Sequence, residues 1–362
     1  MRKYAGYGPL KLLLFTLLAL SASFDSAEAA VPQYVDSWFT NAQGAEVSCI
    51  GLQTPSETVP GDLMLAIFTV REGSPPKAGT TSIIAPSGWT LVSEGGITLS
   101  EDVTDTSGFG IKQAVYYRIA TNSEPGITDA GCSKRSGNYI WQFTNTNNSV
   151  KGVRINAGIA IFHGVDPSDP IDAVSTSGGV STNVITAPSL ITTASNDLLV
   201  GVFGVAGNVG DGLTAPPTND PGALMTIPNG FNDGDGVDGP YNYQSAAGPN
   251  GVSEMVALET FAGPGPTGDR VAAGAFTDSP TAGQLIAIRG SQFDHFVLET
   301  VAGGAIGQQI AGQSFEIRIR AVDTLGNTVP FSGSVDLTSN CTMSEGNGST
   351  PSFTNGVLNN YS

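Results

Sequence analysis

One histidine of this chain is followed closely by several carboxylates, a combination that acid–base catalysis or metal binding requires. His163 ends an apolar run, Gly158 to Phe162. A row of aspartates then follows at Asp166, Asp169 and Asp172. Metal sites and catalytic bases need several convergent groups, however, and Asp before Pro is ordinary turn chemistry. We therefore interpret His163 as a hydrogen-bonded structural residue and the aspartates as turn formers, with an ion site as the alternative.

An acidic, glycine-rich stretch is the best candidate for a metal site. Its aspartates alternate with glycines at Asp233, Asp235 and Asp238. Hard oxygen ligands on a flexible loop are what Ca²⁺ requires. The spacing is similar to that of calcium loops, but the aspartate at the fifth position and the bidentate glutamate at the twelfth are missing. These three residues are our candidate Ca²⁺ ligands, and a solvated acidic loop is the alternative.

Enzyme motifs are absent from the sequence. It contains no G-x-S-x-G, no H-E-x-x-H, no P-loop and no G-x-G-x-x-G before a helix. Ser74 to Lys77 fits S-x-x-K formally, but its two prolines oppose the helix that this motif needs. No motif picks out the pair of carboxylates that a glycosidase requires. The sequence predicts a non-enzymatic protein, and a polysaccharide-acting hydrolase is the less favoured reading.

Aromatic residues offer a different kind of site, because they stack on sugar rings. They also fill the cores of β-sandwiches. Trp89 follows a Pro-Ser-Gly turn and Phe231 follows a matching Pro-Asn-Gly turn, which favours a position at the edge of the core. The same two interpretations apply to Trp38, Trp141, Tyr116 and Tyr117. A carbohydrate-binding module, assisted by calcium, is therefore the alternative function, with an extracellular glycan as its partner.

The composition indicates how such residues are positioned. The 362 residues include 47 Gly and 22 Pro, and only 13% are charged. Long amphipathic helices need Glu, Lys, Leu and Ala, so we expect an all-β fold of short strands and many turns. Apolar or alternating runs predict strands at 62–70, 112–120, 139–144 and 158–162.

A second set of segments repeats the order of the first. Asn196 to Phe203 is similar to Gly61 to Phe68, and Gln284 to Arg289 stands where Gly158 to Phe162 stood. His163-Gly164 in the first copy corresponds to Arg289-Gly290 in the second, which is typical of a polar strand exit. We expect residues 30–290 to form two halves of one sandwich, or two duplicated sandwiches, over 31–165 and 190–290. Segment 207–249 is predicted to be a long loop.

The first 29 residues have the pattern of a signal peptide. A basic start with Arg2 and Lys3 precedes an apolar core at 12–20 and a small-residue cleavage site at Ala27 to Ala29. This core is shorter than the about 20 residues that span a bilayer, so cleavage is favoured. The net charge of −17 disfavours nucleic acid and anionic lipid as partners. We expect a secreted or cell-surface protein with no membrane-spanning segment after cleavage.

Three cysteines bear on the same question of compartment. Export permits disulfides, and a pair between Cys49 and Cys132 would fall within one domain. Cys341 would then be a free thiol or lack its partner. The sequence leaves the pairing open, because the separation of the two Cα atoms is what decides it.

The C-terminal part resembles a known family. The string A-G-Q-S-F-E-I-R-I-R-A-V-D-T-L-G-N-T-V-P-F-S-G-S-V-D-L-T-S at 311–339, with P-S-F-T-N-G-V at 351–357, resembles the bacterial immunoglobulin-like repeats of large surface and secreted proteins. That resemblance implies a sandwich of about seven strands, of which 291–362 hold only part. It also implies a spacer or adhesion role.

Residues 31–290 show only a general likeness to exported bacterial jelly-roll domains. The likeness rests on segments such as G-D-L-M-L-A at 61–66 and H-G-V-D-P-S-D-P-I-D at 163–172. The predicted fold is therefore a jelly-roll-like β-sandwich followed by an incomplete immunoglobulin-like β-sandwich. The predicted function is a structural, display or adhesion role, with a surface protein or glycan as partner.

Overall fold

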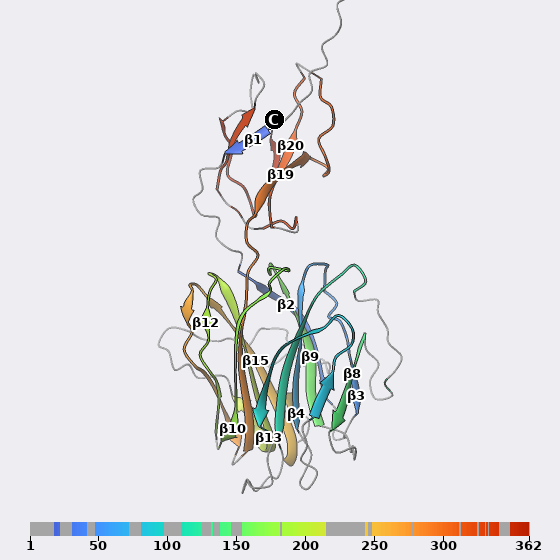
Figure 1. The fold of residues 1–362 in the computed structure, drawn as a ribbon, viewed down its shortest axis with the longest axis vertical. Coiled ribbons are helices and arrows are strands. Elements are labelled where there is room, and N and C mark those ends of the chain that lie inside the picture. The colour runs from blue at the N-terminus through green and yellow to red at the C-terminus, as the bar shows by residue number, and fades with distance from the viewer. Residues whose placement is uncertain are drawn as a thin grey trace, which may run out of the picture. The chain divides into compact units, whose positions relative to one another are not determined.

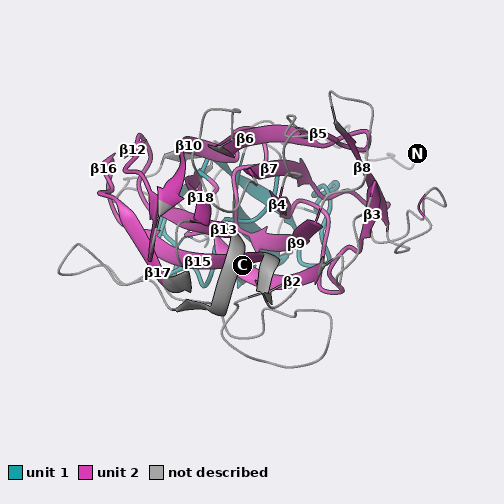
Figure 2. Cartoon of the chain, turned by 90° about the horizontal axis from the view of Figure 1, so that it is seen from below, with its two compact units in different colours: residues 1–28, 292–362 teal, residues 29–291 magenta. Residues whose placement is uncertain are grey.

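The computed structural model describes an all-β protein. The described residues are 18–21, 31–41, 48–71, 81–97, 110–124, 132, 138–145, 154–181, 183–214, 243–244, 248–276, 279–310, 313–323, 326–329, 331, 333–339 and 348–361. Within them every regular element is a strand, arranged in antiparallel sheets. The chain forms two compact units, residues 29–291 and residues 1–28 with 292–362 (Figure 2).

A five-stranded sheet is the centre of the first half of the larger unit. Its order is β2 (Gln33–Asn41), β9 (Arg154–His163), β4 (Leu63–Arg71), β7 (Ile111–Ile119) and β6 (Thr90–Ile97). A smaller sheet has the order β3 (Cys49–Leu52), β8 (Tyr139–Asn145) and β5 (Thr81–Ile84). The four predicted strands are confirmed as β4, β7, β8 and β9, although β9 begins earlier than expected.

A second sheet is the centre of the other half. Its main path is β10 (Ile171–Ser181), β18 (Ser279–Ile288), β13 (Asp197–Thr214), β15 (Gly248–Phe261) and β14 (Tyr243–Gln244). Strand β17 (Arg270–Phe276) pairs with β13 and β11 (Val184–Ala187), and β12 (Ile191–Thr192) pairs with β16 (Gly265–Pro266). The loop prediction for 207–249 is wrong at its two ends, because β13 continues to Thr214 and β15 begins at Gly248.

The two central sheets have the same strand order, with β4 and β13 in the corresponding middle position. Leu63 pairs with Phe162 in the first sheet as Leu198 pairs with Ile288 in the second. The turns before the middle strands also match. Gly61 N donates to Ala120 O at 3.0 Å, and Asn196 N donates to Ala262 O at 3.3 Å. Both turn residues have positive φ, which Gly and Asn adopt most readily.

Alternation of side chains between two covered faces explains why β4 is buried throughout and mostly apolar. Leu65 and Ile67 belong to a core shared with Val200 and Val202 of β13, so the two central sheets pack face to face. Met64, Ala66 and Phe68 belong to a separate core that includes residues of the β3–β8–β5 sheet. A strand buried on both faces has no position left for a solvated side chain. Each large side chain buried this way contributes about 1.5–3 kcal/mol.

Glycines allow the edge strands of the two central sheets to meet. A Cβ atom at Gly178 of β10 would lie 2.3 Å from the backbone C and O of Gly96 in β6. A Cβ at Gly95 would lie 3.1 Å from Thr176 Cβ. Figure 2 shows β6 and β10 next to each other. The backbones of the two sheets therefore come into contact along this side of the sandwich.

The smaller unit contains two three-stranded sheets (Figure 1). One has the order β19 (His295–Thr300), β20 (Ile317–Val322) and β23 (Val357–Tyr361), and the other has β1 (Leu18–Ser21), β21 (Asp336–Ser339) and β22 (Gly348–Ser349). Ile317 and Ile319 belong to a core with Leu337 and Phe353. Phe315 precedes the strand and is 37% exposed.

Candidate functional site

His163 is held by a carboxylate that the sequence analysis did not connect with it. Because Leu63 pairs with Phe162, the preceding Asp62 lies beside the following His163. His163 Nδ1 and the Asp62 carboxylate share a hydrogen bond, and Asp62 also accepts one from Val59 N at 2.8 Å. Burial is the largest influence on Asp62 and raises its pKa. The structural interpretation of His163 agrees with this geometry, but its partner is Asp62.

The second half carries the corresponding pair at the same strand position. Asp197 begins β13 much as Asp62 immediately precedes β4, and Arg289 immediately follows β18 much as His163 ends β9. The two exit segments also pair with each other. Asp166 N donates to Arg289 O at 3.0 Å, and Ser291 N donates to Gly164 O at 2.9 Å. His163 and Arg289 therefore lie at the same end of the sandwich.

Arg289 contacts two of the aspartates that follow His163 in the sequence. Its guanidinium forms ion pairs with Asp169 and Asp172. Asp172 also accepts hydrogen bonds from the backbone N of Thr193, at 2.5 Å, and of Ala194, at 3.3 Å. Burial acts to raise the pKa of Asp172, but the hydrogen bonds from Thr193 and Arg289 outweigh it and lower that pKa. Asp172 is therefore ionised and anchors the segment before β13.

The pKa of Asp197 is shifted in the opposite direction from that of Asp172. Its side chain is fully buried, and burial followed by the negative charge of Asp172 raises its pKa to about 7. Two neighbouring carboxylates thus have pKa values that differ widely, because only Asp172 contacts Arg289 directly. Such separated values are typical of functional sites, although structural ion-pair networks produce them as well.

The aspartates after His163 do not converge on one point. Asp166 accepts hydrogen bonds from the backbone N and the hydroxyl of Ser168 at 2.9 and 2.6 Å, which confirms its role in a turn. Asp169 and Asp172 contact Arg289 instead. The described residues contain no group of three His, Cys, Asp or Glu side chains able to hold a metal ion. The predicted calcium ligands Asp233, Asp235 and Asp238 lie outside the described residues, so that site stays a prediction.

The aromatic residues described by the structure mainly form a core cluster. Trp141 is at its centre, with ring centroids 4.6 Å from Phe68, 4.9 Å from Tyr116 and 5.4 Å from Trp89. Trp89 and Trp141 are buried, which confirms the core-edge prediction for Trp89. Trp38 and Tyr117 are partly buried and pack against the two adjoining cores.

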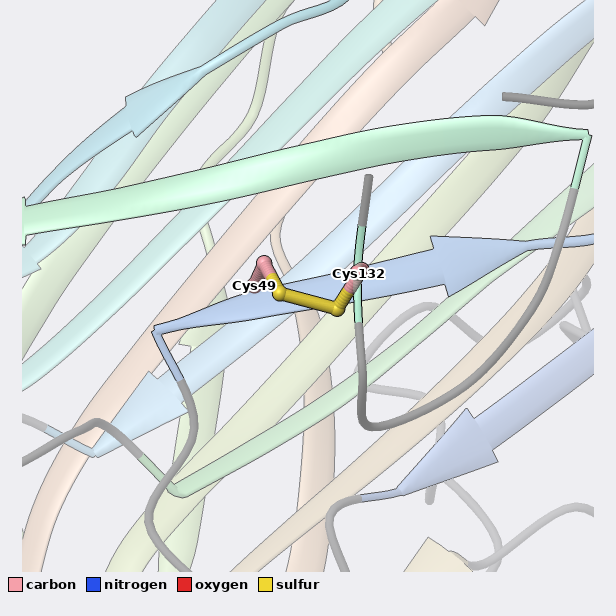
Figure 3. The surroundings of a disulfide bond; sticks show 2 residues. All are labelled: Cys49 and Cys132. Atoms are coloured by element: carbon pink, nitrogen blue, oxygen red, sulfur yellow. A yellow bond between two sulfur atoms is a disulfide. The ribbon is translucent and has the colours of Figure 1, made fainter. Parts of the chain in front are cut away.

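Cys49 and Cys132 form a disulfide, which settles the pairing that the sequence left open (Figure 3). Their Cα atoms are 5.9 Å apart, and 83 positions separate them in sequence. Cys49 is the first residue of β3, so the bond links the small outer sheet to a distant segment. Cys341 lies outside the described residues.

A polar centre lies between the two central sheets, and the sequence analysis missed it. We use this name for Thr69 of β4, Gln113 of β7 and Glu254 of β15, which are all fully buried. Gln113 Nε2 donates to Thr69 Oγ1 at 3.1 Å, and Thr69 Oγ1 shares a hydrogen bond with Glu254 Oε2. The feature of the sequence that could have indicated this centre is the presence of polar residues inside mostly apolar strands. Their convergence requires the pairing of the halves, which the strand pattern alone did not specify.

Burial determines the protonation of Glu254. Removal from water raises the pKa of this carboxyl to about 8, while the hydrogen bond with Thr69 acts in the opposite direction. No ion pair to Glu254 exists among the described residues. The side chain is therefore mostly neutral near pH 7, where it both donates and accepts a proton readily.

Comparison with protein-family models, with curated proteins and with solved structures finds no match to this chain. No helix long and apolar enough to cross a membrane occurs in the part of the chain that the structure describes.

Proposed function

We propose that this chain is a secreted or cell-surface protein with a structural, display or adhesion role and no catalytic activity. Residues 30–290 would be a jelly-roll-like sandwich, and residues 291–362 would belong to an immunoglobulin-like module. The signal-peptide pattern and the disulfide support export. The resemblance of the C-terminal part to repeats of surface proteins supports a serial arrangement of β modules.

One observation carries the proposal. The two central sheets share a single apolar core, so that two halves form one thick body instead of two domains with a cleft between them. Enzymes and small-molecule binders usually place their sites in such interdomain clefts. A body with a continuous core suits a protein that transmits load or holds another module away from a surface.

Two assays on the full chain with its leader removed would test the proposal. Incubation with a panel of polysaccharides should release no reducing ends, and release at a rate that depends on this protein would overturn the non-catalytic role. A glycan array read with and without EDTA should show no retention. Glycan binding that EDTA abolishes would favour the calcium-assisted carbohydrate-binding module over a structural role.

Mechanical unfolding provides the positive measurement. The chain would be pulled between its termini in a force spectrometer, because a load-bearing body should resist extension. We expect residues 30–290 to unfold in one cooperative event or two large ones. Gradual extension at low force would contradict the load-bearing role.

A further inference from the structure

The polar centre places three polar groups beside the apolar core that the two central sheets share. A hydroxyl, a carboxamide and a carboxylic acid lie together there, fully buried. Burying polar groups costs free energy unless every hydrogen bond is restored. Among the described residues, Gln113 Oε1 and Glu254 Oε1 have no hydrogen-bond partner. The hydrogen bonds among the three side chains therefore do not offset the full cost of burying them.

Strand register brings the atoms together. Thr69 and Gln113 are direct cross-strand partners in the β4–β7 ladder, so their side chains leave the sheet on the same face. Gly204 and Glu254 are the corresponding partners in the β13–β15 ladder. A Cβ atom at Gly204 would lie 2.7 Å from Thr69 Cγ2 and 3.0 Å from Gln113 Nε2. The missing side chain at Gly204 thus leaves the space in which the three groups meet.

We propose that Thr69 and Gln113 react in the folded protein to form an intramolecular ester, with Glu254 transferring the proton. Thr69 Oγ attacks Gln113 Cδ, the Oγ–Cδ bond forms, and the Cδ–Nε2 bond breaks. The hydroxyl proton passes through Glu254 to the leaving nitrogen, which departs as ammonia. No oxidant, reductant or cofactor is needed. This cross-link is independent of the proposed function, although a covalent bond between β4 and β7 would suit a load-bearing protein.

The surroundings favour this exchange over hydrolysis. All three side chains are fully buried, and excluding water protects the product ester from hydrolysis. The nucleophile is hydrogen-bonded to both the amide and the acid, so the reaction is intramolecular and its entropic cost has already been met by folding. A carboxyl that titrates near neutrality both accepts and returns a proton. Release and protonation of ammonia in water draw the exchange forward.

Intact-mass measurement tests the proposal on the full chain with its leader removed and its disulfide reduced. We expect a mass lower than that of the sequence by one ammonia. Peptide mapping should find the β4 peptide joined to the β7 peptide through Thr69 and Gln113. Hydroxylamine should separate these isolated peptides, because it cleaves esters and neither β4 nor β7 contains an Asn-Gly step, at which it also cleaves the main chain. A wild-type mass equal to that of the sequence overturns the proposal, as does an ammonia loss that maps to an Asn-Gly step.

Variants identify the roles of the three groups. Thr69→Val and Gln113→Leu should each restore the full mass, and Glu254→Gln should slow or abolish the loss of ammonia. Thr281→Val is the matched control, since Thr281 is buried in β18 and its hydroxyl donates only to Gly179 O. The control should keep the mass deficit. Retention of the deficit in Thr69→Val would overturn the proposal even if the wild-type mass is low.

Discussion

Two carboxyl groups in this protein are buried where ionisation costs free energy, and Glu254 is the clearer case. It is fully buried against Thr69, while Asp197 is buried beside Asp172. Both pKa values are raised, so the native state holds protons that the unfolded state releases. Under linkage, a group of this kind stabilises the fold at low pH and loses that contribution as pH rises through its folded pKa.

We expect the stability of the wild-type protein to fall between about pH 4.5 and pH 8. For Glu254, whose pKa rises from 4.5 to about 8, the change corresponds to roughly 5 kcal/mol. In Glu254→Gln the stability should decrease less as pH rises. A smaller decrease should remain, because Asp197 has a pKa of about 7 and acts in the same direction. Urea denaturation across this pH range measures how the free energy of unfolding changes with pH. This slope is compared between proteins because the proposed ester would alter the absolute stability. Glu57→Gln, at an exposed position, removes the same charge and should leave the slope unchanged.

The contacts of Arg289 and those of His163 should contribute different amounts to the free energy of unfolding. Arg289 forms ion pairs with two carboxylates, Asp169 and Asp172, and the Asp172 side chain is buried. His163 contacts the single carboxylate of Asp62, which also keeps its bond from Val59 N. Arg289→Met should therefore destabilise the fold by about 2–4 kcal/mol, since breaking a buried pair leaves an uncompensated charge. His163→Gln should cost less than about 1.5 kcal/mol. Equal losses in denaturant titrations would contradict this reading of the two pairs.

At the scale of elements, the close approach of β6 and β10 depends on glycine. A side chain at Gly178 would overlap the backbone of Gly96, whereas a side chain at Gly179 would meet nothing within 4 Å. Gly178→Val should lower stability by about 2 kcal/mol or more because the backbones must separate. Gly179→Val is the matched control, and it should be neutral or slightly stabilising because Val favours strands. Similar melting temperatures for the two variants would show that the sheet edges are not in contact.

The strands themselves were predictable to the extent that their pattern is local. The apolar run at 62–70 and the alternation at 139–144 report burial directly, and both became strands. Strand β10, by contrast, contains I-D-A-V-S-T-S-G-G-V-S, which is neither apolar nor strictly alternating. It is held by a long ladder with β18, so its existence depends on a partner distant in sequence. The continuation of β13 beyond Gly207 has the same origin in pairing with β15 and β17.

The polar centre could not be predicted for a related reason. Thr69 and Gln113 are cross-strand neighbours, which a hairpin-like register makes conceivable from sequence. Glu254 reaches them only because the two sheets pack face to face, 185 positions away along the chain. The pairing of Asp62 with His163 was easier to predict. Asp62 and Asp197 stand at the start of matching strands, and His163 and Arg289 stand at the end of matching strands.

At the scale of the whole molecule, the disulfide links the first residue of β3 to a residue 83 positions further along the larger unit. For a loop of this length the chain-entropy model gives about 4.5 kcal/mol of stabilisation. The bond removes this conformational freedom from the unfolded chain. Reduction should therefore lower the melting temperature of the wild-type protein without abolishing its β structure.

A variant pair separates this effect from other consequences of reductant. Cys49→Ala/Cys132→Ala should melt at the temperature of the reduced wild type, and reductant should not lower it further. Cys341→Ala keeps the Cys49–Cys132 bond, so it should lose stability on reduction as the wild type does. Thermal melts followed by circular dichroism, with and without reductant, measure all three proteins. If the double variant melted at the temperature of the oxidised wild type, the disulfide would be a passive feature, and the stability of the unit would come from its shared apolar core alone.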